Sequence, residues 1–218
     1  MNRMDKYQVT TDTFNRLAKS YQDKYMDLDT YNDTYDLVCG FVDKERAELL
    51  DVACGPGNIT KYILAKRPNF KIQGIDLAPN MIELAQINNP TAAFTVMDCR
   101  NISSLGKRFD AIICGFFLPY LSKDDAVQLI RDASGILHPQ GILYLSGMIG
   151  DNKNSGFHKS SSGDKVYIHY HDTEYLSETL QREGFEILDV RYKDEPEQSG
   201  MITKDFFIIA KLTRCSDS

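Results

Sequence analysis

Hydrophobic and polar positions change their period several times between residues 48 and 212. Short apolar runs predict strands, and apolar residues spaced three or four apart predict helices. We expect strands at Glu48–Ala53, Phe70–Ile75, Ala92–Met97, Phe109–Cys114, Ile142–Met148, Phe185–Tyr192 and Asp205–Leu212. We expect helices between them at Asn58–Lys66, Pro79–Ile87, Ser122–Leu137 and Thr173–Glu183.

This order of elements predicts an α/β fold with a doubly wound, seven-stranded, mostly parallel sheet. The run Phe109–Cys114 is almost entirely apolar, which is typical of a strand buried on both faces. No helix separates the last two strands, so we expect the last strand to be antiparallel, at or near an edge. Residues 1–45 predict one or two helices outside the sheet, giving an N-terminal helical cap before a main domain at 46–214.

Composition narrows the class of protein. The chain has 218 residues, 42% hydrophobic and 26% charged, which is an ordinary globular balance. The formal net charge of −6, with no basic run, argues against nucleic acid as a partner. Met1–Thr10 is polar and unlike a secretory signal, and no stretch approaches the ~20 apolar residues of a membrane helix. We therefore expect a cytoplasmic protein without membrane insertion.

Five cysteines are present, and no two have a CxxC spacing. An odd count without such spacing predicts free thiols in a reducing compartment rather than disulfides or a zinc site. They are Cys39, Cys54, Cys99, Cys114 and Cys215. The segment Gly150–Gly163 is rich in Gly, Ser, Asn and Lys, and it predicts a mobile loop.

The most informative segment is Asp51–Asn58, between the first strand and the first helix. In an open parallel sheet, ligands bind at the carboxyl ends of the strands. Gly55 and Gly57 form a GxG pair, and Thr60 stands where a dinucleotide fingerprint has its third glycine. Asp51 would also repel a pyrophosphate. Two interpretations remain, a tight structural turn or a ligand loop, and a nicotinamide-dependent oxidoreductase is disfavoured.

Two further carboxylates end the next two strands. Asp76 follows the second strand, where a carboxylate can accept hydrogen bonds from ribose hydroxyls. Asp98 follows the third strand, and its neighbour Cys99 offers a backbone amide to an adenine. Met81 lies one turn into the helix after Asp76, where it could pack on adenine or in a core. Together they predict a nucleoside site.

The motifs DVACGPGNIT, IDLAPNMIELA, VMDC and FDAIICGFFLPYL, in this order, resemble those of class I S-adenosylmethionine-dependent methyltransferases. The resemblance runs from about Leu49 to Met148 and continues to Leu212. The overall pattern is similar to ubiquinone and menaquinone methyltransferases. It implies a seven-stranded sheet with an antiparallel last strand, S-adenosylmethionine as cofactor and S-adenosylhomocysteine as product.

Carried over by position, the resemblance implies a set of cofactor-binding residues. Those near the methionine portion and the methyl group are Tyr21, Asp51, Ala53, Gly55, Gly57, Cys114 and Phe116. Those near the ribose and the adenine are Asp76, Leu77, Met81, Asp98 and Cys99.

The acceptor side is less determined by the sequence. Phe116, Phe117 and Tyr120 follow the fourth strand and form either an aromatic acceptor wall or ordinary core. Tyr120 and His171 are the candidate catalytic residues, with His171 as a general base or, alternatively, a surface or capping histidine. No metal site is expected. The N-terminal helices and Gly150–Gly163 are expected to cover the acceptor.

The function that follows is methyl transfer from S-adenosylmethionine to a small organic acceptor, aromatic or quinone-like. A non-catalytic S-adenosylmethionine-binding sensor or partner protein remains the main alternative. The sequence leaves the acceptor, the atom methylated, the pathway and a homodimeric assembly open.

Overall fold

The computed structural model describes residues 5–159, 163–194 and 204–213. The main sheet contains seven strands: β1 (Glu48–Val52), β2 (Lys71–Asp76), β3 (Ala93–Val96), β4 (Phe109–Cys114), β5 (Leu137–Met148), β8 (Phe185–Asp194) and β9 (Lys204–Leu212). The helices are α1 (Lys6–Tyr25), α2 (Asn32–Phe41), α3 (Asn58–Lys66), α4 (Pro79–Asn88), α5 (Lys123–Ile136) and α6 (Thr173–Arg182). Short 3₁₀ helices are η1 (Cys99–Leu105), η2 (Leu118–Tyr120) and η3 (Asn152–Asn154).

The strand order confirms the predicted sheet. It is β3-β2-β1-β4-β5-β9-β8, with the first five strands parallel. β9 is antiparallel to both of its neighbours, β5 and β8, and it lies one position from the edge. The direct β8–β9 connection explains this, because parallel neighbours need a crossover and antiparallel ones do not.

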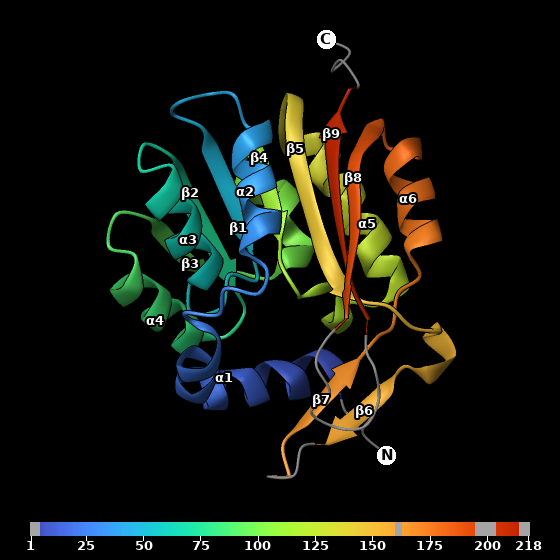
Figure 1. Ribbon diagram of the computed structural model, residues 1–218. Helices are drawn as coiled ribbons and strands as arrows, with labels where there is room; N and C mark the ends of the chain where they lie inside the picture. Colours follow the sequence, from blue (N-terminus) through green and yellow to red (C-terminus); the bar gives the residue numbers. More distant parts are fainter. Residues whose placement is uncertain (1–4, 160–162, 195–203, 214–218) are drawn as a thin grey trace.

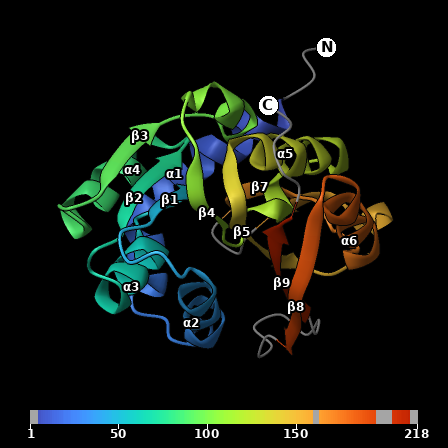
Figure 2. The same cartoon turned by 90° about the horizontal axis from the view of Figure 1, so that it is seen from above.

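Two hydrophobic layers cover the sheet on opposite faces (Figure 2). Adjacent residues of β1 alternate between them, with Leu49 packing toward α2 and α3 and Leu50 toward α5 and α6. The apolar run in β4 is buried on both faces, as the sequence predicts. α2 therefore shares the core of the sheet, with Tyr35 and Val38 buried in the α2–α3 layer.

α1 occupies a different place from the other helices. It lies across the carboxyl ends of the parallel strands, beside a two-stranded hairpin (Figure 1). The hydroxyl of Thr13 donates to the Lys165 carbonyl at 2.7 Å, and that of Thr10 accepts from the Tyr167 amide at 3.0 Å. α1 thus covers the edge of the sheet at which ligands bind in parallel sheets.

The hairpin corrects one sequence-based expectation. Part of the segment predicted as a mobile loop forms β6 (Gly156–Lys159), which pairs antiparallel with β7 (Lys165–Ile168); residues 160–162 lie outside the described residues. Phe157 faces Tyr167 across this pair, with ring centroids 5.1 Å apart. The polar composition of this segment does not predict a strand. The strand is stabilised by pairing with β7, which in turn packs on the distant α1.

Capping residues set several helix boundaries. Ser122 caps α5 by accepting a hydrogen bond from the Asp125 amide, and Asp172 caps α6 by accepting one from the Glu174 amide. Gly184, just after α6, has φ 87°, a backbone conformation that favours glycine. The four cysteines in the described residues are free, and Cys215 lies outside them. Among the described helices, none has the length and apolarity needed to cross a membrane.

Candidate functional site

The loop after β1 is shaped by three left-handed residues. Ala53, Gly55 and Gly57 have φ values of 53°, 52° and 80°. A Cβ on Gly57 would stand 2.4 Å from Asn89 Nδ2, so glycine is required there both for the backbone angle and for space. Gly57 is also the N-cap of α3. The loop therefore turns sharply and presents the backbone of Gly55 to the strand edge.

Asp51 lies under this loop and is 2% exposed. Its Oδ2 accepts a hydrogen bond from Thr60 Oγ1 at 2.6 Å. Burial, with the nearby charge of Asp76 adding to it, raises the pKa of Asp51 to about 7, against the lowering effect of Thr60. Thr60, the residue that breaks the dinucleotide fingerprint, therefore has a role of its own in holding the Asp51 carboxyl.

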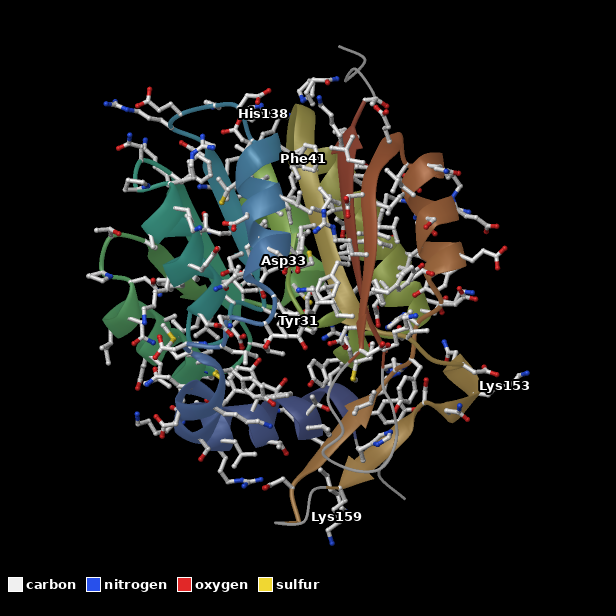
Figure 3. The ribbon with its side chains drawn as sticks, in the orientation of Figure 1. Tyr31, Asp33, Phe41, His138, Lys153 and Lys159 are labelled. Carbon is white, nitrogen blue, oxygen red and sulfur yellow. The ribbon has the colours of Figure 1, made fainter. Side chains whose placement is uncertain are left out.

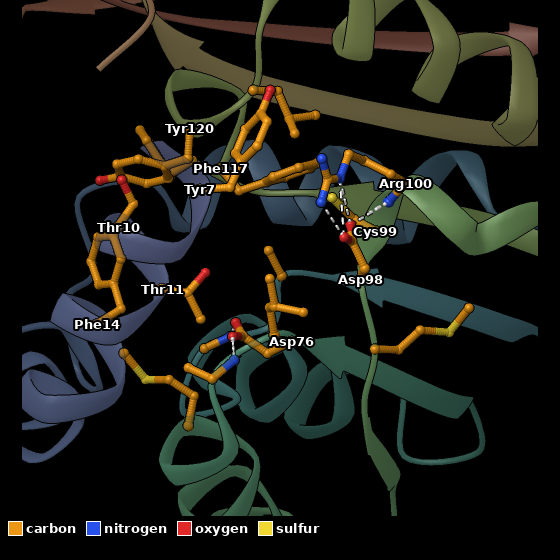
Figure 4. A pocket seen from close by; sticks show the side chains of 18 of the residues that line it. Tyr7, Thr10, Thr11, Phe14, Asp76, Asp98, Cys99, Arg100, Phe117 and Tyr120 are labelled. Carbon is orange, nitrogen blue, oxygen red and sulfur yellow. Dashed lines mark hydrogen bonds and ion pairs between the residues drawn. The ribbon is translucent and has the colours of Figure 1, made fainter. Parts of the chain in front are cut away.

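Asp76 ends β2 and is tied to the same loop. Its Oδ2 accepts from the Gly55 amide at 3.0 Å, and its Oδ1 accepts from the Ala78 amide at 2.8 Å. Burial raises the pKa of Asp76, although these backbone hydrogen bonds oppose the shift. These two hydrogen bonds fix the orientation of the carboxylate, which borders the adjacent cavity (Figure 4).

That cavity has an open volume of about 870 Å³, a figure that includes the solvent at its mouth. It is bounded by α1, the loop after β1, the ends of β2 and β4, η1 and η2. Ten of the residues expected from sequence line it: Tyr21, Ala53, Gly55, Asp76, Leu77, Met81, Asp98, Cys99, Phe116 and Tyr120. The structure therefore brings most of the candidate site together around one space.

The end of the cavity near Asp98 carries an ion pair. Arg100 Nε donates to both Asp98 carboxylate oxygens at 3.0 Å, and Arg100 Nη2 donates to Oδ2 at 2.5 Å. Burial opposes ionisation of Asp98, but Arg100 outweighs it and the pKa of Asp98 is lowered. The guanidinium also lies over the Tyr7 ring, 4.5 Å from its centroid. Burial raises the pKa of the Cys99 thiol to about 12, so this thiol stays protonated at neutral pH.

Four expected site residues lie outside the cavity lining. Asp51 lies beneath the loop after β1, and Gly57 ends that loop as the N-cap of α3. Cys114 is fully buried at the end of β4. The next residue but one, Phe116, reaches the cavity with a left-handed backbone of φ 55°, and its amide donates to Ser146 Oγ at 2.9 Å.

His171 is the fourth. It is fully buried, with Nε2 at 2.8 Å from the Leu118 carbonyl oxygen and Nδ1 hydrogen-bonded to the Tyr175 hydroxyl. The carbonyl can only accept, so Nε2 carries the proton and Nδ1 accepts from Tyr175. Burial lowers the pKa of His171, which keeps the ring neutral. This geometry makes His171 a residue that ties η2 to α6.

Tyr120, the other catalytic candidate, does line the cavity. Its ring meets the Phe14 ring edge-on, with centroids 4.9 Å apart. Burial raises the pKa of Tyr120, so its hydroxyl is protonated at neutral pH and can donate or accept a hydrogen bond but is a poor base. No grouping of three or more histidine, cysteine or acidic side chains suited to a metal occurs in the part of the chain that the structure describes.

Sequence reasoning missed one wall of the cavity. Additional lining residues come from α1 and from the residue after η2: Tyr7, Thr10, Thr11, Phe14 and Leu121. Phe117, which the sequence suggested as part of an acceptor wall, also lines the cavity. Tyr7, Thr11, Phe14 and Tyr21 are four, three and seven positions apart, which places them on one helical face. This spacing could have predicted that one face of α1 lines the site. The helix has too few apolar residues for the pattern to be recognised in the sequence.

Comparisons with known proteins agree with this geometry. A family model described as a methyltransferase domain matches residues 49–141, from β1 into β5. A putative methyltransferase, YqeM, from Bacillus subtilis is 35% identical over 104 residues, covering 45% of this chain and 41% of that protein. The chain thus spans well under half the length of that relative.

A second relative covers more of the chain. The demethylmenaquinone methyltransferase of Thermotoga maritima is 26% identical over 163 residues, covering 64% of this chain and 70% of that protein.

Among solved structures, the magnesium protoporphyrin IX methyltransferase of Synechocystis PCC 6803 with bound S-adenosylmethionine has the same fold. The TM-score is 0.70 at 15% identity, over 97% of this chain and 99% of that one. The sheet order, the loop after β1 and these matches lead to one assignment. Residues 49–141 match the methyltransferase-domain family, and the sheet has the fold of class I S-adenosylmethionine-dependent methyltransferases, with distant homology to the menaquinone and ubiquinone enzymes.

Proposed function

We propose that this protein transfers a methyl group from S-adenosylmethionine to a small organic molecule. The observation that carries the proposal is the Asp76 carboxylate, held by the Gly55 and Ala78 amides at the edge of the cavity. A carboxylate at this position is suited to accept from the two hydroxyls of a ribose. When bound, the cofactor supplies an activated methyl group on a sulfonium that leaves as a neutral thioether.

The residues present fit such a nucleoside. Asp98, Cys99, Leu77 and Met81 all line the cavity, and we expect the adenine edge to meet Asp98 and the Cys99 backbone while Leu77 and Met81 supply apolar surface. At the other end, the backbone of Gly55 is open to the cavity and Tyr21 covers it, with Tyr21 Cε1 3.8 Å from where a Gly55 Cβ would stand. The Asp51 carboxyl beneath this loop adds an acidic group near the expected ammonium.

Methyl transfer asks the protein for alignment and for exclusion of water. Phe14, Phe116, Phe117 and Tyr120 also line the cavity, and they supply an apolar, aromatic wall. We expect the acceptor to lie against this wall, which suits an apolar or aromatic molecule. Tyr120 would orient the acceptor by hydrogen bonding, since its raised pKa makes it a poor base. The names of the Thermotoga and Synechocystis proteins also refer to small-molecule acceptors.

The test is incubation of the purified protein with methyl-labelled S-adenosylmethionine and fractionated small-molecule extracts. We expect label in an extractable product together with an equal amount of S-adenosylhomocysteine. Asp76→Ala should abolish both, whereas Glu178→Ala, a change on the exposed face of α6, should not. Cofactor binding without any S-adenosylhomocysteine, across all fractions, would instead establish a non-catalytic sensor. The homodimer expected from sequence stays a prediction, which light scattering during size-exclusion chromatography would test.

A further inference from the structure

The cavity-facing side of α1 runs along the whole length of the proposed cofactor site. Tyr7, Thr11, Phe14 and Tyr21 all line the cavity from this one helix. At ~1.5 Å per residue, the fourteen positions from Tyr7 to Tyr21 span roughly 21 Å, which is enough to cover an extended nucleoside with an amino-acid tail. Contacts at three points along α1 fix which residue overlies which part of the site.

The first point is at the adenine end. Tyr7 lies under the Arg100 guanidinium, which is paired with Asp98. The Tyr7 hydroxyl donates to Asp125 and accepts from the Ser122 amide at 3.0 Å. The start of α1 is therefore anchored beside the residues expected to meet the adenine.

The second point lies over the start of α4. The Asn15 side-chain oxygen accepts from the Asn80 amide at 2.8 Å, and Asn80 Nδ2 donates to the Asn15 carbonyl at 2.8 Å. Asn80 follows Asp76 by four residues. The third point is Tyr21, which lies against Gly55 at the methionine end.

Thr11 lies one helical turn from Tyr7 and one turn from Asn15, so it overlies the stretch between Asp98 and Asp76. In Figure 4 its side chain points into the cavity, between α1 and Asp76. Thr10 and Thr13 use their hydroxyls to hold α1 on β7. In contrast, the Thr11 hydroxyl makes no hydrogen bond with any part of the chain that the structure describes.

We propose that the Thr11 hydroxyl hydrogen-bonds a ribose hydroxyl of the cofactor, on the side opposite Asp76. This inference rests on the proposed function, because it requires a nucleoside in the cavity. The carboxylate of Asp76 can only accept, whereas the hydroxyl of Thr11 can donate or accept. A vicinal diol would thus be held from both walls, and α1 serves the cofactor as well as the acceptor.

Calorimetric titration with S-adenosylhomocysteine and with its 2′,3′-dideoxyribose analogue tests this. Thr11→Val keeps the shape and removes the hydroxyl, Thr11→Ser keeps the hydroxyl, and Ser20→Ala is the control on the exposed face of α1. Loss of one hydrogen bond should weaken S-adenosylhomocysteine binding by about 3- to 10-fold in Thr11→Val. Thr11→Ser and Ser20→Ala should bind like the native protein. With the dideoxy analogue, Thr11→Val and the native protein should bind alike.

Equal affinity of Thr11→Val and the native protein for S-adenosylhomocysteine would overturn the inference and leave the proposed function intact. An equal loss with both ligands would overturn it too, since the effect would then be a displacement of α1. Failure of the native protein to bind S-adenosylhomocysteine at all would instead remove the proposed function, and this inference with it.

Discussion

The buried Asp51 carboxyl makes the free energy of unfolding decrease as the pH rises. Its pKa is about 7 in the folded chain and roughly 3.9 in an unfolded one. The folded state therefore holds the proton more tightly. The stabilisation that results is complete below pH ~4 and is lost as the pH rises through about 7. At ~1.4 kcal/mol per pKa unit the full effect is on the order of 4 kcal/mol, of which roughly 3 kcal/mol disappears between pH 5 and pH 8.

Asp51→Asn removes this titration and leaves an amide oxygen to accept from Thr60. Urea unfolding at pH 5, 6, 7 and 8 gives the unfolding free energy of each protein. We expect the difference between variant and native protein to move in favour of the variant by roughly 3 kcal/mol from pH 5 to pH 8. Gln181→Ala, which changes an uncharged, exposed side chain of α6, should show no such trend. A variant-minus-native difference that stays constant over this range would show that Asp51 does not titrate there.

Three further changes follow from the geometry. Ala53 has a left-handed backbone with φ 53°, so Ala53→Gly should relieve strain in the folded state. This gain should exceed the cost of the more flexible unfolded chain by roughly 0.5 kcal/mol and raise the melting temperature slightly. A lower melting temperature would contradict this. His171→Ala leaves buried partners unpaired and should cost about 3 kcal/mol of stability, seen in urea melts, with S-adenosylhomocysteine affinity preserved; a lost affinity in the folded variant would place His171 in the site. Tyr7→Phe removes the hydroxyl bonded to Asp125, so limited proteolysis should cut α1 faster, and an unchanged rate would show that this anchor is dispensable.

The sheet and the cofactor side of the site were predictable because each carries a local signal. Asp76 and Asp98 come at the ends of two strands that the sequence predicts, and the carboxyl ends of parallel strands meet at one edge. The glycines at positions 55 and 57 indicate a left-handed backbone, which the structure has at both positions. Such features need no knowledge of distant contacts.

The remaining site residues depend on packing between distant segments. Tyr7, Thr11 and Phe14 lie on a polar helix that reaches the cavity through contacts with distant segments, among them β7, more than 150 residues away. His171 shows the opposite case. Its ring is hydrogen-bonded to the Leu118 carbonyl and to the Tyr175 hydroxyl, so it does not point into the cavity. No local sequence pattern indicates these two partners.

We expect S-adenosylmethionine to bind in the cavity beside Asp76. The most direct measurement is calorimetric titration of the native protein and of Asp76→Ala with S-adenosylmethionine, S-adenosylhomocysteine and NADH. We expect the native protein to bind the first two and not NADH, and we expect Asp76→Ala to lose most of that affinity. Preference for NADH, or undiminished binding to Asp76→Ala, would contradict the assignment of the loop after β1 and of the ribose contact.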